Sequence, residues 1–280
     1  MVNINTNVSS IIAQRGLINS TNALDTLMKR MSTGYKLNSA SDNAANYAIT
    51  QALSSKISSL SVAEENANLG LDMVQSMSSV LELISKQATR LRDIAEQAAN
   101  GTYGTASIDA MNQEAQSIID EIVRLTKDND FGEISMFSEA EQAEGDEEIS
   151  EPTNMITLQI GIGSGDDSKI SFNAYFSIAD ILDIATMGIN NTDALDIIDA
   201  FMDKLLNKQV EYGSVSNRLT SVLDSISVKY NNLVSSRSTL RDADAGELSS
   251  EYVKQQILQQ AAATLLSTAN QSPAIALQLI

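Results

Sequence analysis

The chain has 280 residues, enough for one to three domains with a sizeable buried core. Its 36 acidic and 18 basic residues give a formal net charge of −18, which opposes binding to nucleic acid and to anionic membrane surfaces. It contains no cysteine and no histidine, which excludes disulfides, thiol nucleophiles and the usual zinc sites. We therefore expect no enzyme, no cofactor and no metal centre.

The sequence carries no recognisable targeting segment. Its first ten residues lack the basic segment, the apolar run and the small-residue cleavage site of a secretory signal. No stretch approaches the roughly 18 consecutive apolar residues of a membrane-spanning helix. Taken alone, these two observations predict a cytoplasmic protein.

Residues 1–42 are predicted to form an N-terminal helix followed by a linker. The apolar residues of this helix are spaced three and four apart but define only a weak face, so it needs a partner surface. Gly34 suits the position just after the helix end, and Ser41 or Asp42 suits the N-cap of the next helix.

Residues 43–194 are predicted to hold the N-terminal part of a core helical bundle. A long helix over about residues 43–100 is followed by a shorter one that starts near Ser107 and can fold back antiparallel on it. Gly70 lies beside a phase slip in the apolar seam of the long helix, where it would allow a bend.

The same region contains an acidic loop and a β-hairpin. The seven acids of residues 139–151 match no calcium-loop spacing and are interpreted as a solvated loop. Residues 156–161 and 169–172 read as two strands joined by a glycine-rich turn, because neither phosphate-binding glycine pattern is present. A connector with room for a short helix then leads to residue 194.

Residues 195–240 carry a heptad seam in one register over more than six heptads, with no proline and one glycine. They predict a single C-terminal rod helix of the core bundle. Residues 241–280 hold a last helix from about residue 248 to 270, followed by an apolar end. Leaving that end in water would forgo about 1.5 to 3 kcal/mol per large side chain, so a partner surface is expected.

Both termini of the chain resemble bacterial flagellins. The N-terminal resemblance lies in Ile4-Asn5-Thr6-Asn7 and in the run KRMSTGYKLNSASDNAA at residues 29–45. The C-terminal resemblance lies in ILQQA at residues 257–261, in ANQSP at residues 269–273 and in the apolar tail. It covers residues 1 to about 135 and 195 to 280, and the hairpin between them is similar to the core β-element of the family.

The resemblance implies a mainly α fold: a long antiparallel helical bundle or coiled coil with a small β-hairpin and with the N- and C-terminal helices paired. Fewer than 25 residues separate Phe172 from Leu195, which implies a core-only subunit without the large outer domains of many flagellins. Residues 1–42 and 241–280 would then be the polymerisation regions of the inner tube.

The function implied is that of a structural subunit that polymerises into the extracellular bacterial flagellar filament for swimming motility. Flagellins are exported unfolded without a cleaved signal peptide, and their partners are further copies, an export chaperone, the filament cap and hook-associated proteins. The candidate polymerisation residues are Ile4, Val8, Ile11, Leu17, Leu24, Leu27, Met31, Ile257, Leu258, Leu265, Leu266, Ile275, Leu277, Leu279 and Ile280.

A further stretch resembles the surface that the flagellin-sensing Toll-like receptor reads. This sequence has Ala88 and Thr89 where such flagellins usually have leucine and glutamine. Packing of the same surface against the next subunit is the other interpretation, and both can hold. The receptor-recognition candidates are Arg90, Leu91, Ile94, Gln97, Met111 and Glu114.

The sequence allows two alternative functions and excludes a third. A flagellin-like hook–filament junction protein would share the terminal motifs. An acidic cytoplasmic coiled-coil scaffold would suit the composition, and it predicts a discrete oligomer with ordered termini. The metalloprotease that some flagellins host requires an HExxH helix, which a chain without histidine cannot provide.

Overall fold

The computed structural model describes residues 6–132, 134–137, 154–191 and 193–278. The chain divides into two compact units, residues 58–230 and residues 1–57 with 231–280. Helices dominate both units and the predicted β-hairpin is present, which confirms the predicted fold class. The division into four regions stays a prediction, and the acidic loop lies outside the described residues.

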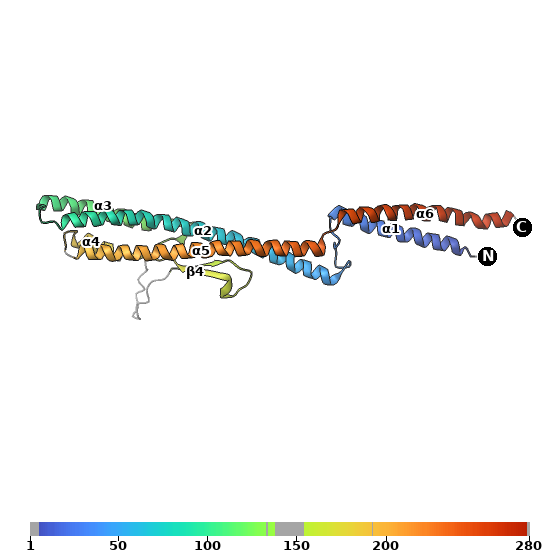
Figure 1. The fold of residues 1–280 in the computed structure, drawn as a ribbon, viewed down its shortest axis with the longest axis horizontal. Helices are drawn as coiled ribbons and strands as arrows, with labels where there is room; N and C mark the ends of the chain where they lie inside the picture. Colours follow the sequence, from blue (N-terminus) through green and yellow to red (C-terminus); the bar gives the residue numbers. More distant parts are fainter. Residues whose placement is uncertain (1–5, 133, 138–153, 192, 279–280) are drawn as a thin grey trace. The chain divides into compact units, whose positions relative to one another are not determined.

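The unit of residues 58–230 is a helical bundle. Helix α2 (Ala44–Ala98) enters it at residue 58, and α3 (Thr105–Lys127) folds back antiparallel along it (Figure 1), as predicted. Helix α5 (Ala194–Arg241) supplies the third long element. The core between these helices is aliphatic, and its fully buried members include Val74, Met77, Leu81, Ile84, Leu91, Ile122, Ile198, Phe201, Tyr212 and Leu219.

The heptad seam of α5 is buried along one row. Residues spaced by seven, from Ile198 through Leu205, Tyr212 and Leu219 to Ile226, are all at most 3% exposed. The companion row is only partly buried, and Phe201 beside it enters the core at 0% exposure. Beyond Leu219 only Ile226 of α5 is buried, so the buried face narrows toward the end of the helix.

The predicted hairpin is confirmed, with shifted ends. Strand β3 (Met155–Gln159) pairs antiparallel with β4 (Lys169–Asn173), Thr157 facing Ser171. The first strand was expected to reach residue 161. It stops earlier because the chain turns back tightly there: a Cβ at Gly161 would lie 2.9 Å from the Ser168 Cβ.

One edge of the hairpin is seated directly on α2. Gly70 is buried, and a Cβ built on it would lie 2.3 Å from Leu158 Cδ1. Four residues earlier on the helix, Asn66 Nδ2 donates a hydrogen bond of 3.0 Å to the Gln159 carbonyl. Gly70 therefore lets a strand approach the helix closely, a role that the sequence pattern did not indicate.

The end of β4 is fastened to α5. Lys208 Nζ donates to the Asn173 carbonyl at 2.7 Å and lies 2.9 Å from Glu211 Oε2. Tyr212 OH donates to the Ala174 carbonyl at 3.2 Å, and burial raises the pKa of this phenol well above its ordinary value. The hairpin is thus held between two helices by a close contact on one side and polar contacts on the other.

Four short elements complete this unit. One is the 3₁₀ helix η1 (Asp166–Ser168), which lies in the turn of the hairpin. Helix α4 (Ala179–Met187) lies in the connector, where room for a short helix was noted. Strands β1 (Asp130–Phe131) and β2 (Ile134–Ser135) form a small pair that was not predicted, because two-residue strands leave no periodicity to detect.

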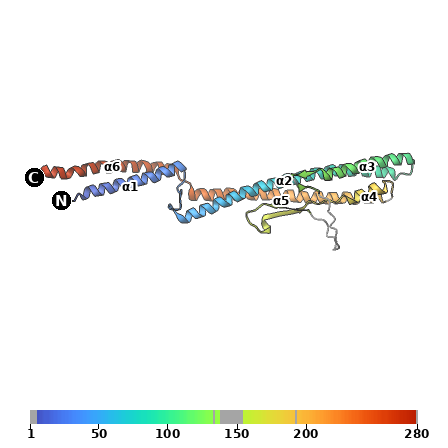
Figure 2. The ribbon, with the colours of Figure 1, turned by 180° about the vertical axis from the view of Figure 1, so that it is seen from behind.

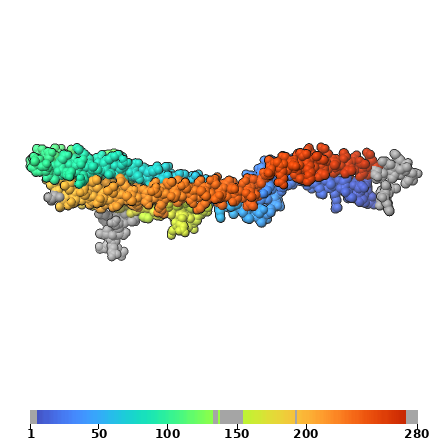
Figure 3. Space-filling view, viewed as in Figure 1, coloured from blue at the N-terminus to red at the C-terminus, as the bar shows by residue number. Residues whose placement is uncertain are grey.

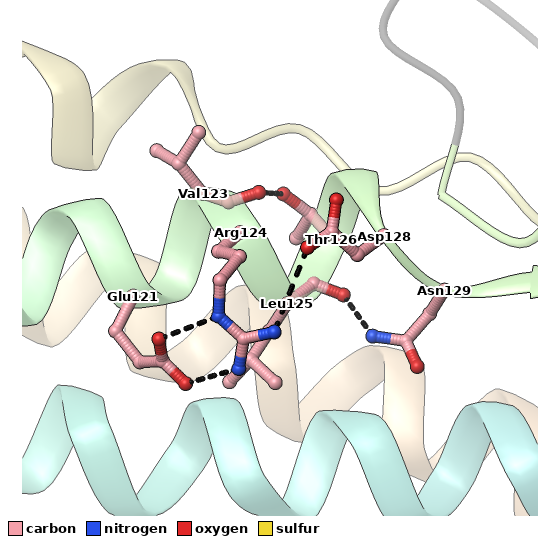
Figure 4. Close-up of polar contacts among 7 residues, drawn as sticks. All are labelled: Glu121, Val123, Arg124, Leu125, Thr126, Asp128 and Asn129. Atoms are coloured by element: carbon pink, nitrogen blue, oxygen red, sulfur yellow. Dashed lines mark hydrogen bonds and ion pairs between the residues drawn. The ribbon is translucent and has the colours of Figure 1, made fainter.

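The C-terminal end of α3 is closed by its own side chains (Figure 4). Arg124 contacts Glu121 Oε1 at 2.6 Å and Asp128 Oδ2 at 3.5 Å, and its guanidinium holds the pKa of Glu121 below the usual value. Asn129 Nδ2 donates to the Leu125 carbonyl at 2.5 Å, satisfying an acceptor that the helix end leaves open. The positive charge also complements the helix dipole at this end.

The second unit pairs the two terminal helices. Helix α1 (Val8–Thr33) lies antiparallel beside α6 (Ala245–Gln278) in both ribbon views (Figures 1 and 2). Gly34 ends α1 with φ 71°, as predicted from the sequence. Helix α6 was expected to end near residue 270 but continues to Gln278, past Pro273.

The linkers that follow α1 and α5 are joined to each other. Lys36 N donates to the Arg241 carbonyl at 2.8 Å, Ala243 N donates to the Gly34 carbonyl at 3.0 Å, and the Arg241 guanidinium stacks 4.0 Å from the Tyr35 ring centroid. These contacts fix the point from which the terminal helices start.

The cap of α2 differs from the prediction. Asn43 Oδ1 accepts the Asn46 N–H at 3.0 Å, so Asn43 performs the capping expected of Ser41 or Asp42. The Asp42 carboxylate is engaged one turn earlier, accepting from the backbone N–H groups of Asn38 and Ser39 at 2.9 Å each.

Candidate assembly surface of the terminal helices

The pairing of α1 and α6 is polar at its open end. Asn7 Nδ2 donates to the Ala269 carbonyl at 2.6 Å, and Ser10 Oγ donates to Asn270 Oδ1 at 2.8 Å. Asn7 is also the N-cap of α1, since its Oδ1 accepts the Ser10 N–H. These bonds set the register of the two helices but bury little apolar surface.

The apolar seam between the two helices is narrow. Leu24 and Leu27 of α1 and Ala262 of α6 are 7–8% exposed, and Ser20 is buried with its hydroxyl bonded to the Gly16 carbonyl. The helices approach closely at Gly16, where a Cβ would lie 3.8 Å from the Ala262 Cβ. Small residues thus allow close packing, and few large side chains are covered by it.

Helix α1 leaves its larger apolar residues in solvent. Ile12 is 65% exposed and Val8 is 56% exposed, values typical of polar surface residues. A helix that is apolar on more than one face needs more than one partner. The exposed large apolar residues of α1 are Val8, Ile11, Ile12, Ile18, Met28 and Met31.

Helix α6 carries a matching exposed stripe. Val253, Ile257 and Leu265 recur at steps of four or eight residues along one face, and they are 52%, 60% and 62% exposed. Leu258 lies beside them at 46%. Figure 3 shows α6 as an open surface with α1 running along it. We name these ten exposed large apolar residues of α1 and α6 the terminal apolar surface.

Several predicted polymerisation residues belong to this surface. Val8, Ile11, Met31, Ile257, Leu258 and Leu265 are exposed, and Leu17 and Leu266 are half-buried. Ile4, Leu279 and Ile280 lie outside the described residues, as do the side chains of Ile275 and Leu277.

Two of the predicted residues lie in the seam of the helix pair. Leu24 and Leu27 are each 7% exposed in the single chain, so they stabilise the pair, and their part in polymerisation stays a prediction. Sequence reasoning missed Ile12, Ile18, Met28 and Val253, which are exposed at 47–65%. Size and hydrophobicity were available signals, but the sequence did not show which face the partner helix takes.

The receptor-recognition candidates are split between surface and core. Arg90 and Glu114 are exposed and paired, with Nη2 2.6 Å from Oε1, and Gln97 is exposed about two turns further along α2. Met111 is half-buried. Leu91 and Ile94 are 0% and 1% exposed, which corrects their assignment to a recognition surface, because they pack inside the bundle.

The described part of the chain contains no group of three or more acidic side chains placed to hold a metal ion. None of its helices is long and apolar enough to cross a bilayer.

Comparison with known proteins identifies both ends of the chain. Residues 4–142 match the bacterial flagellin N-terminal helical region, and residues 195–280 match the bacterial flagellin C-terminal helical region. A flagellin of Bacillus subtilis (strain 168) is 28% identical over 308 residues, with 99% of each chain covered. A flagellin of Halalkalibacterium halodurans is 27% identical over 282 residues, again with 99% of each chain covered.

A solved structure shows the same kind of fold. A flagellar hook-associated protein from Vibrio parahaemolyticus superposes with a TM-score of 0.55 and 17% identity, covering 72% of this chain and 100% of that one. At this identity the likeness concerns the fold alone. The flagellin of H. halodurans has nearly the length of this chain, which agrees with a core-only form.

Proposed function

Because the chain belongs to the bacterial flagellin family, whose members are structural subunits of the extracellular flagellar filament, we propose that the terminal apolar surface binds neighbouring copies during polymerisation. The alternative of a cytoplasmic scaffold is not favoured, and neither is that of a hook–filament junction protein. The observation that carries the proposal is the exposure of ten large apolar side chains on two paired helices.

The free energy available from covering this surface is similar in size to the cost of association. Complete burial of a large apolar side chain contributes about 1.5–3 kcal/mol. The side chains of the terminal apolar surface have about half of their area exposed, so covering each of them contributes about 1 kcal/mol. Ten such residues supply on the order of 10 kcal/mol per subunit, comparable with the estimated 4–15 kcal/mol that association costs. Contacts elsewhere on each subunit add to this free energy, which by itself roughly offsets the cost of association.

The experiment compares two substitutions on α6. Leu265→Asp places a carboxylate in the exposed stripe, whereas Gln260→Asp places one at an exposed polar position of the same helix. We expect Leu265→Asp to raise the critical concentration for seeded polymerisation by about tenfold or more, which corresponds to at least about 1.4 kcal/mol per subunit. Gln260→Asp should change it little.

Pelleting of filaments after seeding measures both variants, and circular dichroism of the monomers checks that the helices persist. Equal critical concentrations for Leu265→Asp, Gln260→Asp and the unchanged chain would refute the proposal. A deletion of residues 250–280 serves as the limiting case and should give no filaments.

The same surface supports the proposal of an export chaperone as a partner. Before assembly the apolar stripe of α6 has no cover, and a chaperone that shields it would prevent premature association. We expect a complex of one chaperone with the chain that Leu265→Asp weakens and Gln260→Asp does not. The filament cap and hook-associated proteins are proposed to meet the terminal helices at the filament ends.

Export without a cleaved signal is proposed for the same chain. The sequence lacks the features of a cleavable signal, and flagellar filaments lie outside the cell. Mass spectrometry of the protein in sheared filaments should find the N-terminal residues of the printed sequence, with at most the initiator methionine removed. A mass that lacks a longer N-terminal segment would contradict this.

Receptor recognition is proposed through the exposed candidates Arg90, Gln97 and Glu114. Their side chains lie on neighbouring faces of α2 and α3 and are open to solvent in the single chain. In a receptor-reporter cell assay, Arg90→Ala should reduce the response to monomer, whereas the exposed Lys86→Ala should not. An unchanged response to Arg90→Ala would contradict the proposal that the receptor binds this surface.

A further inference from the structure

The turn between α2 and α3 holds the only Asn-Gly pair of the chain, Asn100-Gly101. Helix α2 ends at Ala98 and α3 starts at Thr105, so both residues lie outside regular structure, and both are exposed. A Cβ built on Gly101 would meet nothing within 4 Å. The Gly101 N–H donates no hydrogen bond to any described residue. Its nitrogen is therefore open and unengaged.

The side chain of Asn100 is held toward the following peptide. The Thr102 N–H donates to Asn100 Oδ1 at 3.2 Å, which closes a local side-chain turn. This bond keeps the carboxamide folded over the Gly101 backbone. It also withdraws electron density from the amide carbon and would stabilise negative charge that develops on Oδ1, as an oxyanion-hole donor does.

We propose that Asn100 is a site of spontaneous deamidation. The Gly101 backbone nitrogen loses its proton and attacks Asn100 Cγ, forming a C–N bond. The Cγ–Nδ2 bond breaks, and the amide leaves as ammonia after taking up a proton. Water then opens the five-membered imide at either carbonyl and gives aspartate or isoaspartate. No oxidation or reduction occurs, and water is the only co-reactant.

Two other loop asparagines lack this combination, because the next backbone nitrogen is engaged. Ser39 N, after Asn38, donates to Asp42 Oδ2 at 2.9 Å, and Asn191 N, after Asn190, donates to the Gly188 carbonyl at 3.3 Å. Within helices such as α2, the next nitrogen is committed to the helical hydrogen-bond ladder. The open backbone nitrogen that follows it, and not only the Asn-Gly sequence, therefore distinguishes Asn100 from these asparagines.

The product would change the charge of this turn. Asn100 lines an open groove of about 350 Å³ together with Asp93, Glu96, Gln97 and Tyr103. A carboxylate at position 100 would be the third negative charge in that groove, and it would lie just past the C-terminal end of α2, where the helix dipole disfavours it. Deamidation therefore loosens the α2–α3 turn.

The test follows the purified chain in mildly alkaline buffer by peptide mapping and mass spectrometry, with isoaspartate detected by enzymatic methylation. We expect residue 100 to gain the mass difference between an amide and a carboxylate before any other asparagine. Asn68, exposed on α2, is the internal control and should keep its amide. Retention of the Asn100 amide while the urea-unfolded chain converts it would overturn the proposal.

Two variants test the geometry. Gly101→Ala crowds the attacking nitrogen and should slow conversion. Thr102→Pro removes the donor to Oδ1 and should slow conversion by about two- to tenfold, the range for one solvent-exposed hydrogen bond. Rates in urea correct for intrinsic effects of each substitution, and circular dichroism confirms folding. A folded Thr102→Pro variant that deamidates as fast as the unchanged chain would refute the role of the turn.

Discussion

Replacing Gly70 by alanine tests whether the hairpin depends on a missing side chain. In the structure the new Cβ would lie 2.3 Å from Leu158 Cδ1 and 3.3 Å from its Cγ, too close for either to stay in place. Overpacking of this kind costs about 1–3 kcal/mol. Against it stands the gain of about 1 kcal/mol from replacing a helical glycine by alanine.

A second glycine provides the matched control. Gly213 lies within α5, and a Cβ there would meet nothing within 4 Å, so Gly213→Ala should stabilise the monomer by about 1 kcal/mol. The helix-propensity gain is common to both variants and cancels in their difference. Gly70→Ala should therefore be about 1–3 kcal/mol less stable than Gly213→Ala.

Urea unfolding of the monomer, followed by circular dichroism, measures this difference. The double variant Gly70→Ala with Leu158→Ala should recover part of it, because the clashing methyl groups are removed. Equal stabilisation by Gly70→Ala and Gly213→Ala would show that the strand does not rest on the helix at Gly70 and would refute the reasoning.

Three further predictions concern polar groups. Lys208→Met should cost about 1.5–3 kcal/mol in urea unfolding, because it leaves the part-buried Asn173 carbonyl at the end of β4 without its charged donor. Two backbone N–H groups lower the pKa of Asp42 in the folded chain. The stability that this carboxylate contributes is therefore present above its pKa in the unfolded chain and is lost as the pH falls through its lower pKa in the folded chain. Asp42→Asn should flatten the acid limb of the curve of unfolding free energy against pH. Burial raises the pKa of Tyr212 in the folded chain. The stability that this neutral phenol contributes is therefore present below its pKa in the unfolded chain and is lost as the pH rises through its higher pKa in the folded chain. Ultraviolet titration should show one tyrosine that ionises only on unfolding, and Tyr212→Phe should abolish that step.

Much of the fold follows from local sequence patterns. The seven-residue repeat of α5 predicted a rod whose core row, including Ile198 and Leu219, is buried as expected. The glycine-rich turn between two β-rich stretches predicted the hairpin, and Gly34 predicted the end of α1. These features are local, because backbone geometry and side-chain periodicity act within a few residues of each other.

Contacts between distant segments were not predictable in this way. Gly70 looked like a bend, but its role depends on Leu158, which is 88 residues later in the chain. The sequence favoured Ser41 or Asp42 as the N-cap of α2, but in the folded chain Asn43 caps the helix. The hydrogen bond between Asn7 and Ala269 could not be predicted from either residue alone.

The candidate site shows the same division. Hydrophobic composition of the terminal helices and their flagellin-like motifs determined that these helices need partners and that the chain is a filament subunit. Only the tertiary structure decided that Leu24 and Leu27 are buried in the chain's own helix pair, while Ile12 and Leu265 remain exposed in the single chain. The physical reason is that periodicity reports how much apolar surface a helix carries, whereas the partner's position determines which part of that surface water still reaches.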